Sequence, residues 1–174
     1  LARILVNDGD VVSLLGEEGG HCAADFARAR EDVCAEIDRL TALGRLTAEQ
    51  AAAVDSEKLG ALLHSPLFDR ILRSPRVYRE ERFAVMIAPS LIDERYEGVD
   101  TACKSLLQGA IDLAFEEDGR LVILDYKTDR VSDLQKLGEL YRKQLLLYKE
   151  AMEQSLDIEV SELIICSIHL NDFL

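Results

Sequence analysis

Apolar positions in the first third of the chain recur at helical spacing. From Phe26 to Leu40 they lie three, four or seven residues apart among charged residues, which predicts one helix over residues 23–43. Gly44 stands where a C-terminal cap is expected. The chain therefore opens its folded part with a helix.

A second helix is predicted from Thr47 to Leu63. Thr47 and Gln50 have the three-residue spacing of a capping box, and apolar residues follow at helical spacing. This helix must end before Pro66, which begins a shorter helical piece over residues 66–72.

The second half of the chain changes to strand patterns, with a long helix before the last strand. Strands are predicted at residues 79–87, 108–115, 120–126 and 162–168. The third and fourth are apolar throughout, so they lie inside a sheet covered on both faces. A stripe from Leu134 to Met152 predicts the long helix, over residues 132–154. The result is a mixed α/β layer.

Two segments lack a clear pattern. Residues 1–22 contain an Asn-Asp-Gly-Asp turn and a Gly- and Glu-rich stretch, which favours a small hairpin or an irregular arm. Residues 93–104 are polar and predicted to be a loop. The folded domain is therefore expected to span residues 23–174.

Composition narrows the function classes. The 174 residues carry 33 Asp and Glu against 20 Lys and Arg, a formal charge of −13, which excludes a binder that attracts nucleic acid over its whole surface. No window approaches the ~18 consecutive apolar residues of a membrane span. The four cysteines form no C-x-x-C pair, so reduced thiols in a cytosolic protein are expected.

The chemistry follows from the hairpin. If Asp118 and Gly119 are the two turn residues, opposed residues have numbers that sum to 237, so Asp112 faces Asp125 and Lys127 lies on the same face. Two carboxylates this close are destabilising unless a positive charge lies between them. Two hard oxygen ligands with an ammonium beside them predict a Mg²⁺ site, or alternatively a Mn²⁺ site, for phosphodiester hydrolysis.

A plainer interpretation stays open. Asp112 and Asp125 can simply end their strands at the solvent edge, with Lys127 paired to one of them. The apolar residues on either side of both aspartates count against this, since charges inside a covered sheet usually have a function.

Three segments resemble the nuclease domain at the C-terminal end of AddA/RexA and RecB-type helicase-nucleases, in the PD-(D/E)xK superfamily. These are Gln108-Gly109-Ala110-Ile111-Asp112, Leu124-Asp125-Tyr126-Lys127-Thr128-Asp129, and Tyr141 with Gln144-Leu145-Leu146-Leu147-Tyr148. The resemblance covers about residues 23–168. It implies a restriction-endonuclease-like mixed sheet flanked by helices.

The resemblance also implies the roles of single residues. Asp112 and Asp125 match the metal-binding carboxylates, and Lys127 matches the catalytic lysine. Gln144 and Tyr148 match the family's helix motif, and their i, i+4 spacing puts them on one helix face near the site, although Tyr148 also completes the apolar stripe. These five residues form the expected site, with Mg²⁺ as cofactor and Mn²⁺ as the alternative.

Some positions depart from the family. Its metal-binding histidine has only His21 as a candidate here, outside the expected motif, so His21 is left out of the site. Glu80 matches an acidic position, and an exposed charge is the commoner role for such a residue. Ile111 replaces a proline without harm to the chemistry. The cysteine cluster of the AddB branch is absent.

No G-x-x-x-x-G-K-[ST] loop occurs, so we expect no ATPase motor in this chain and regard it as a domain cut from, or encoded apart from, a longer protein. The function implied is a metal-dependent DNA exonuclease of an ATP-dependent helicase-nuclease that processes double-strand breaks for recombinational repair. Its expected partners are DNA, the helicase portion of the parent chain and an AddB/RexB-like subunit, in the bacterial cytoplasm and without a membrane. The alternative is a catalytically incomplete docking module of the same complex.

Overall fold

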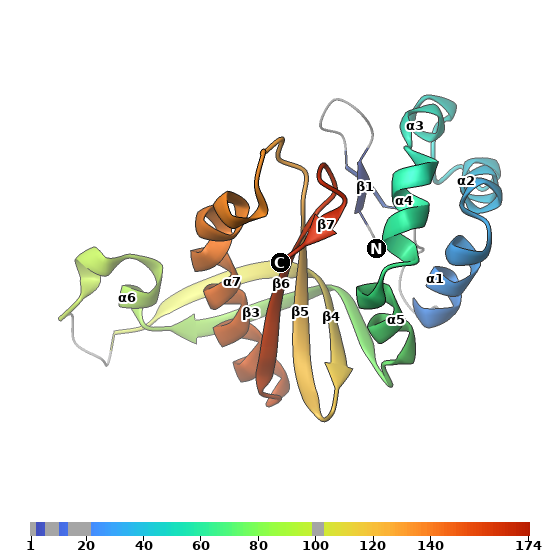
Figure 1. Cartoon of the computed structure of the whole chain (residues 1–174). Coiled ribbons are helices and arrows are strands. Elements are labelled where there is room, and N and C mark those ends of the chain that lie inside the picture. The colour runs from blue at the N-terminus through green and yellow to red at the C-terminus, as the bar shows by residue number, and fades with distance from the viewer. Residues whose placement is uncertain (1–2, 6–10, 14–21, 99–102) are drawn as a thin grey trace.

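The computed structural model describes residues 3–5, 11–13, 22–98 and 103–174 (Figure 1). Its elements in chain order are β1 (Arg3–Leu5), β2 (Val11–Ser13), α1 (Cys22–Glu31), α2 (Val33–Ala42), α3 (Ala48–Ala53), α4 (Ser56–Leu63), α5 (Pro66–Arg73), β3 (Val77–Ile87), α6 (Pro89–Ile92), the 3₁₀ helix η1 (Glu94–Tyr96), β4 (Ser105–Glu117), β5 (Arg120–Lys127), α7 (Leu134–Leu156), β6 (Val160–Ser167) and β7 (Asp172–Phe173).

The two long N-terminal helices predicted from periodicity are each wrong in one respect: both are broken. Asp32 adopts an extended conformation between α1 and α2, and its carboxylate accepts a hydrogen bond from the Ala35 N–H at 2.9 Å. Asp55 separates α3 from α4 in the same way, with the Lys58 N–H as donor at 3.0 Å. Aspartate competes with the helix for backbone N–H groups, so it starts a new helix at both places.

The other local signals of this region are confirmed. Thr47 and Gln50 form a reciprocal capping box at the start of α3. Gly44 follows α2 with a φ of +69°, the left-handed conformation that a helix C-terminus commonly needs. Pro66 begins α5, where its missing N–H costs no hydrogen bond.

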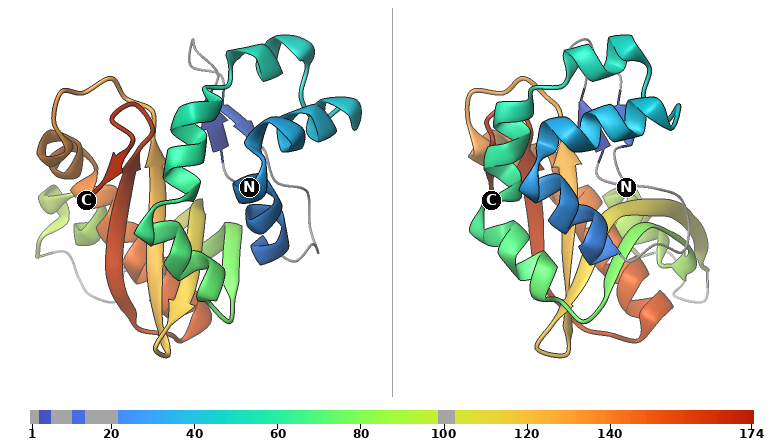
Figure 2. Two further views of the ribbon diagram at one scale, coloured as in Figure 1. Left: turned by 45° about the vertical axis from the view of Figure 1, so that its right-hand side comes forward. Right: turned by 90° about the vertical axis from the view of Figure 1, so that its right-hand side faces the viewer.

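Within the described residues, one mixed sheet has the order β3-β4-β5-β6-β7, as predicted. The β5–β6 pair is parallel and the other pairs are antiparallel. Helices α1–α5 lie on one side of this sheet and α7 on the other (Figures 1 and 2). The sheet is therefore covered on both faces.

The central strands supply both cores because their side chains alternate. Leu113, Phe115 and Leu124 pack with the N-terminal helices in one cluster. Leu121 and Ile123 pack on the opposite face, with Ala151 and Met152 of α7 among their neighbours. Residues 121–124 are at most 1% exposed, which confirms a strand inside a covered sheet.

The β4–β5 turn is the predicted one. Asp118 and Gly119 have φ values of +52° and +73°, and Glu117 pairs with Arg120. Positive φ at both central residues is the signature of a type I′ hairpin turn. Paired residues sum to 237 as far as Leu113 and Leu124.

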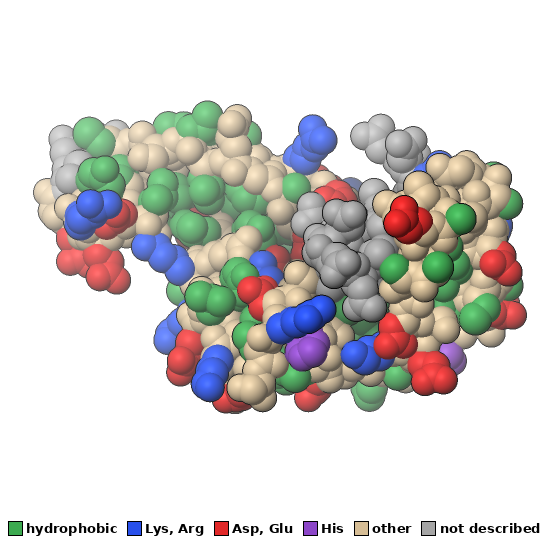
Figure 3. Space-filling view, turned by 90° about the horizontal axis from the view of Figure 1, so that it is seen from above, with side chains coloured by type: hydrophobic (Ala, Val, Ile, Leu, Met, Phe, Trp, Pro, Cys, Tyr) green, Lys and Arg blue, Asp and Glu red, His purple; other side chains and the backbone are tan. Residues whose placement is uncertain are grey.

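Strands β3 and β4 continue together beyond the end of β5. Their pairing extends to Ile87 and Ser105, so they form an arm that carries α6 at its tip (Figure 1). Hydrophobic side chains gather over this arm when it is seen from above, and Met86 and Leu106, which pair across it, are at least half exposed (Figure 3).

Part of the N-terminal segment is regular. β1 and β2 pair as antiparallel strands, which agrees with the hairpin alternative and not with an irregular arm. His21 lies outside the described residues. Among the helices that the structure describes, none is both long and apolar enough to cross a membrane.

Candidate active site

Asp112 lies where β4 leaves the regular ladder. The β3–β4 pairing runs from Arg79–Leu113 directly to Glu81–Ile111, and the β4–β5 pairing ends at Leu113. One oxygen of the buried Asp112 carboxylate accepts a hydrogen bond from the Tyr126 N–H at 2.9 Å. The carboxylate is thereby fixed against β5 beside the residue that follows Asp125.

Glu80 adopts an unusual conformation in the same interruption of β3. Its φ of +46° lies in the left-handed region that non-glycine residues seldom adopt. Glu80 and Asp112 are the two positions that the β3–β4 pairing omits, so the distortion of the sheet coincides with the first predicted metal ligand. Strained backbone of this kind often accompanies functional sites.

Asp125 and Lys127 form a buried ion pair near the end of β5. The Lys127 Nζ lies 2.6 Å from the Asp125 Oδ2, and the two side chains are 12% and 3% exposed. Both residues lie on the α7 face, since they share the alternation of Leu121 and Ile123. The ammonium supplies the positive charge that the two neighbouring carboxylates require.

Helix α7 completes the arrangement from the other side. The Lys127 Nζ donates to the Gln144 Oε1 at 2.9 Å, and the Gln144 Nε2 donates to the Tyr148 hydroxyl at 2.6 Å. Asp125, Lys127, Gln144 and Tyr148 therefore form one continuous chain of polar contacts, although β5 and α7 are separate elements. Asp112 joins them through the backbone of Tyr126.

Tyr141 and Asp129 also contact this chain, and sequence reasoning assigned neither a role. The Lys127 Nζ lies 3.9 Å from the centre of the Tyr141 ring, and the Tyr141 hydroxyl donates to the Asp129 Oδ2 at 3.0 Å. Burial, and then the hydrogen bond to Asp129, raises the pKa of Tyr141 above its usual value. The signal in the sequence was the helical spacing of Tyr141 and Gln144.

Phe83 and Gly109 support Tyr148 from the sheet. The Phe83 ring meets Tyr148 edge-to-face, with ring centres 5.9 Å apart. A Cβ on Gly109 would lie only 2.7 Å from the Phe83 Cζ. Glycine at this position of β4 therefore lets the Phe83 ring lie flat against the strand and contact Tyr148.

The donors present suit a hard divalent cation with few protein ligands. Mg²⁺ usually keeps several waters and is held by one or two carboxylates together with substrate phosphates. Asp112 and Asp125 supply two carboxylates from neighbouring strands. Within the part of the chain that the structure describes, no group of three His, Cys, Asp or Glu residues could form a cage.

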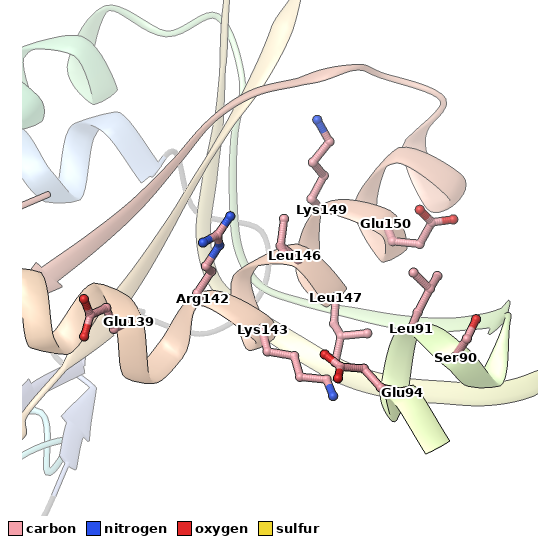
Figure 4. A pocket seen from close by; sticks show the side chains of 10 residues that line it. All are labelled: Ser90, Leu91, Glu94, Glu139, Arg142, Lys143, Leu146, Leu147, Lys149 and Glu150. Carbon is pink, nitrogen blue, oxygen red and sulfur yellow. The ribbon is translucent and has the colours of Figure 1, made fainter. Parts of the chain in front are cut away.

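A groove of about 560 Å³ lies on another side of α7, between this helix and the α6–η1 segment (Figure 4). None of the five predicted site residues lines it. Its floor includes Leu91 and Leu146, and its charged residues balance, with three acidic and three basic: Glu94, Glu139, Glu150, Arg142, Lys143 and Lys149. It therefore offers no surplus of positive charge to a polyanion.

Comparison with known proteins confirms the resemblance. A family model described as the PD-(D/E)XK nuclease superfamily matches residues 20–169. An ATP-dependent helicase/nuclease subunit of the AddA type, from Acetivibrio thermocellus, is 37% identical over 139 residues, which are 76% of this chain and 11% of that protein.

Two further relatives carry the same name. The protein from Ruminiclostridium cellulolyticum is 36% identical over 71% of this chain and 10% of its own length, and that from Alkaliphilus oremlandii is 35% identical over 82% and 12%. The chain thus spans about a tenth of the length of the curated relatives it matches.

Proposed function

Because this chain belongs to the PD-(D/E)XK nuclease superfamily, we propose that it is a metal-dependent deoxyribonuclease whose site comprises Asp112, Asp125, Lys127, Gln144 and Tyr148. The observation that carries the proposal is the buried Asp125–Lys127 pair, which continues through Gln144 to Tyr148 on a different element. A buried ion pair is weak support for stability alone, so a functional reason for retaining it is favoured.

Asp112 and Asp125 would hold the metal, Mg²⁺ with Mn²⁺ as the alternative. A divalent ion bound there supplies Lewis acidity toward a phosphate and lowers the pKa of a bound water. The contribution of the chain is to hold two carboxylates in place before substrate arrives. The hydrogen bond from the Tyr126 N–H fixes Asp112, and the ammonium of Lys127 fixes Asp125.

Lys127 would stabilise negative charge that develops on the phosphate in the transition state. Its ammonium has three donors, and the contacts to Asp125 and Gln144 hold it at a fixed point in a site with little water. Gln144 accepts from Lys127 through its oxygen, and its amide nitrogen donates to Tyr148, so Tyr148 sets which end of the amide faces the ammonium.

The charge of the chain limits how DNA would bind. A net charge of −13 opposes long-range approach, so affinity must come from a few local cations and from the metal bound at the two carboxylates. We therefore expect weak binding that requires the divalent ion and has a shallow salt dependence, with a slope of about 0.7–0.9 per phosphate contact.

The wider role rests on the relatives, which are named as AddA-type subunits of an ATP-dependent helicase/nuclease. We propose that the domain acts as an exonuclease on DNA ends during double-strand-break processing for recombinational repair. Its partners would be the helicase portion of a longer polypeptide and an AddB/RexB-like subunit in the bacterial cytoplasm. Residues 23–174 would form the nuclease domain.

The test is cleavage of linear DNA by the 174-residue chain in Mg²⁺ or Mn²⁺. Asp125→Asn should abolish cleavage, and Lys127→Ala should lower the rate while leaving binding in Ca²⁺ nearly intact, because its role falls in the transition state. Asp38→Asn and Lys58→Ala, at exposed positions of α2 and α4, are the matched controls. A Lys127→Ala protein as fast as the parent would show that the roles are wrongly assigned.

Metal binding separates this proposal from a catalytically incomplete docking module. The absence of a three-residue acidic or histidine cluster among the described residues favours the second candidate. If the site binds metal only when folded, Mn²⁺ should stabilise the parent by about 2.7 kcal/mol at a hundredfold excess over Kd. Asp112→Asn should remove this gain. A parent that neither melts higher in Mn²⁺ nor cleaves DNA is the docking module.

A further inference from the structure

Lys127 is surrounded by three groups, and only two of them belong to the site proposed above. Asp125 and Gln144 accept its hydrogen bonds, and the face of the Tyr141 ring covers the ammonium at 3.9 Å. An aromatic face attracts an ammonium most strongly where both are removed from water. Lys127 is 12% exposed, so this contact is largely shielded from solvent.

The Tyr141 ring is itself held at both ends. Its backbone belongs to α7, three residues before Gln144, and its hydroxyl donates to Asp129 in the segment that follows β5. Leu137, Leu145 and Ile165 form the small apolar cluster against which Tyr141 packs. The ring therefore has little freedom to leave the Lys127 ammonium.

The hydroxyl contact also connects two elements. Asp129 lies two residues after Lys127, so the Tyr141–Asp129 hydrogen bond ties the exit of β5 to α7. The same two elements are joined by the Lys127–Gln144 hydrogen bond. Tyr141 thus restrains Lys127 both through its ring and through the chain that leaves β5.

We propose that Tyr141 is a positioning residue for the Lys127 ammonium: its ring face fixes Nζ beside Asp125, and its hydroxyl holds the segment after β5 against α7. This inference rests on the proposed function of Lys127 as the group that stabilises the transition state. The ring face is the essential part, because it contacts Nζ directly, while the hydroxyl acts one step further away.

Two substitutions separate the ring from the hydroxyl. Tyr141→Phe keeps the ring and loses the hydrogen bond to Asp129, so kcat for DNA cleavage should stay within about threefold of the parent. Tyr141→Leu keeps an apolar side chain but removes the ring, so kcat should fall at least tenfold with KM unchanged. Tyr96→Leu, the same substitution at a half-exposed tyrosine on η1, is the control and should leave both constants unchanged.

Lysine side-chain NMR provides a readout that does not depend on cleavage. The ring current of Tyr141 should shift the Lys127 ε-methylene protons upfield, and their signal is assigned by its loss in Lys127→Arg. The shift should persist in Tyr141→Phe and disappear in Tyr141→Leu. A parent without an upfield lysine signal would overturn the proposal.

The remaining outcomes also decide. A purely structural role predicts that Phe and Leu variants lose thermal stability and kcat together, which would overturn the positioning role. A Leu variant that loses the NMR shift but keeps its full kcat would overturn it as well. If the parent shows the shift but cleaves no DNA in Mg²⁺ or Mn²⁺, the proposed function fails, and the NMR comparison alone decides whether Tyr141 positions Lys127.

Discussion

Substitution of Gly109 by alanine tests the packing that supports the site. The new Cβ would lie 2.7 Å from the Phe83 Cζ and 3.2–3.3 Å from the two Cε atoms. Carbon atoms pack best at about 3.5–4.0 Å, so the ring must move by about 1 Å. Phe83 is 6% exposed and has little free space around it. Overpacking of this kind costs about 1–3 kcal/mol.

The same substitution at Gly60 is a matched control with the opposite expected sign. Gly60 lies in α4, and a Cβ there would meet only the Val33 Cγ2, at 3.8 Å. Alanine is favoured over glycine in a helix by up to about 1 kcal/mol. Gly60→Ala should therefore raise the free energy of unfolding, and Gly109→Ala should lower it.

Thermal unfolding followed by circular dichroism measures both changes. In a chain of this size, each kcal/mol shifts Tm by about 2–4 °C. The clash predicts coupling, so Gly109→Ala should cost about 0.5–3 kcal/mol less in a Phe83→Leu background than in the parent. DNA cleavage should also fall in Gly109→Ala, since Phe83 contacts Tyr148. Equal stabilisation by both alanines, or strict additivity with Phe83→Leu, would refute the reasoning.

Three further predictions concern charge and burial. Arg70 lowers the pKa of Glu117 through a 2.7 Å hydrogen bond, a stabilisation that is lost as pH falls below the ordinary value of 4.5, so Arg70→Gln should flatten the acid-side loss of stability in urea titrations. Lys127→Met should cost about 3–5 kcal/mol in chemical denaturation by leaving Asp125 as a buried charge without its ammonium, and addition of Asp125→Asn should recover most of it; equal losses would contradict this. Burial raises the pKa of the Cys166 thiol to about 12, so Cys166 should react with Ellman's reagent at pH 8 only after unfolding, and reaction in the native state would disprove its burial.

Signals that act over a few residues were readable in advance. The Asp118-Gly119 dipeptide determined the turn and the register of the hairpin, and the helical spacing of Gln144 and Tyr148 put them on one face of α7. The breaks at Asp32 and Asp55 were also local, since both are N-caps, but apolar periodicity alone passed over them. Local hydrogen bonds and side-chain period suffice for such features because their partners lie within four residues.

The contacts that make a site out of these elements depend on distances along the chain that no local pattern encodes. Lys127 meets Gln144 and Tyr141 because β6 pairs in parallel with β5, which requires the intervening α7 to cross one face of the sheet. The conflict between Gly109 and any larger residue arises only once β3 lies against β4. Thus the sequence by itself determined the hairpin, the helix stripe and the residue types of the site, whereas the tertiary structure decided which of them touch, because packing places residues 14 to 26 positions apart side by side.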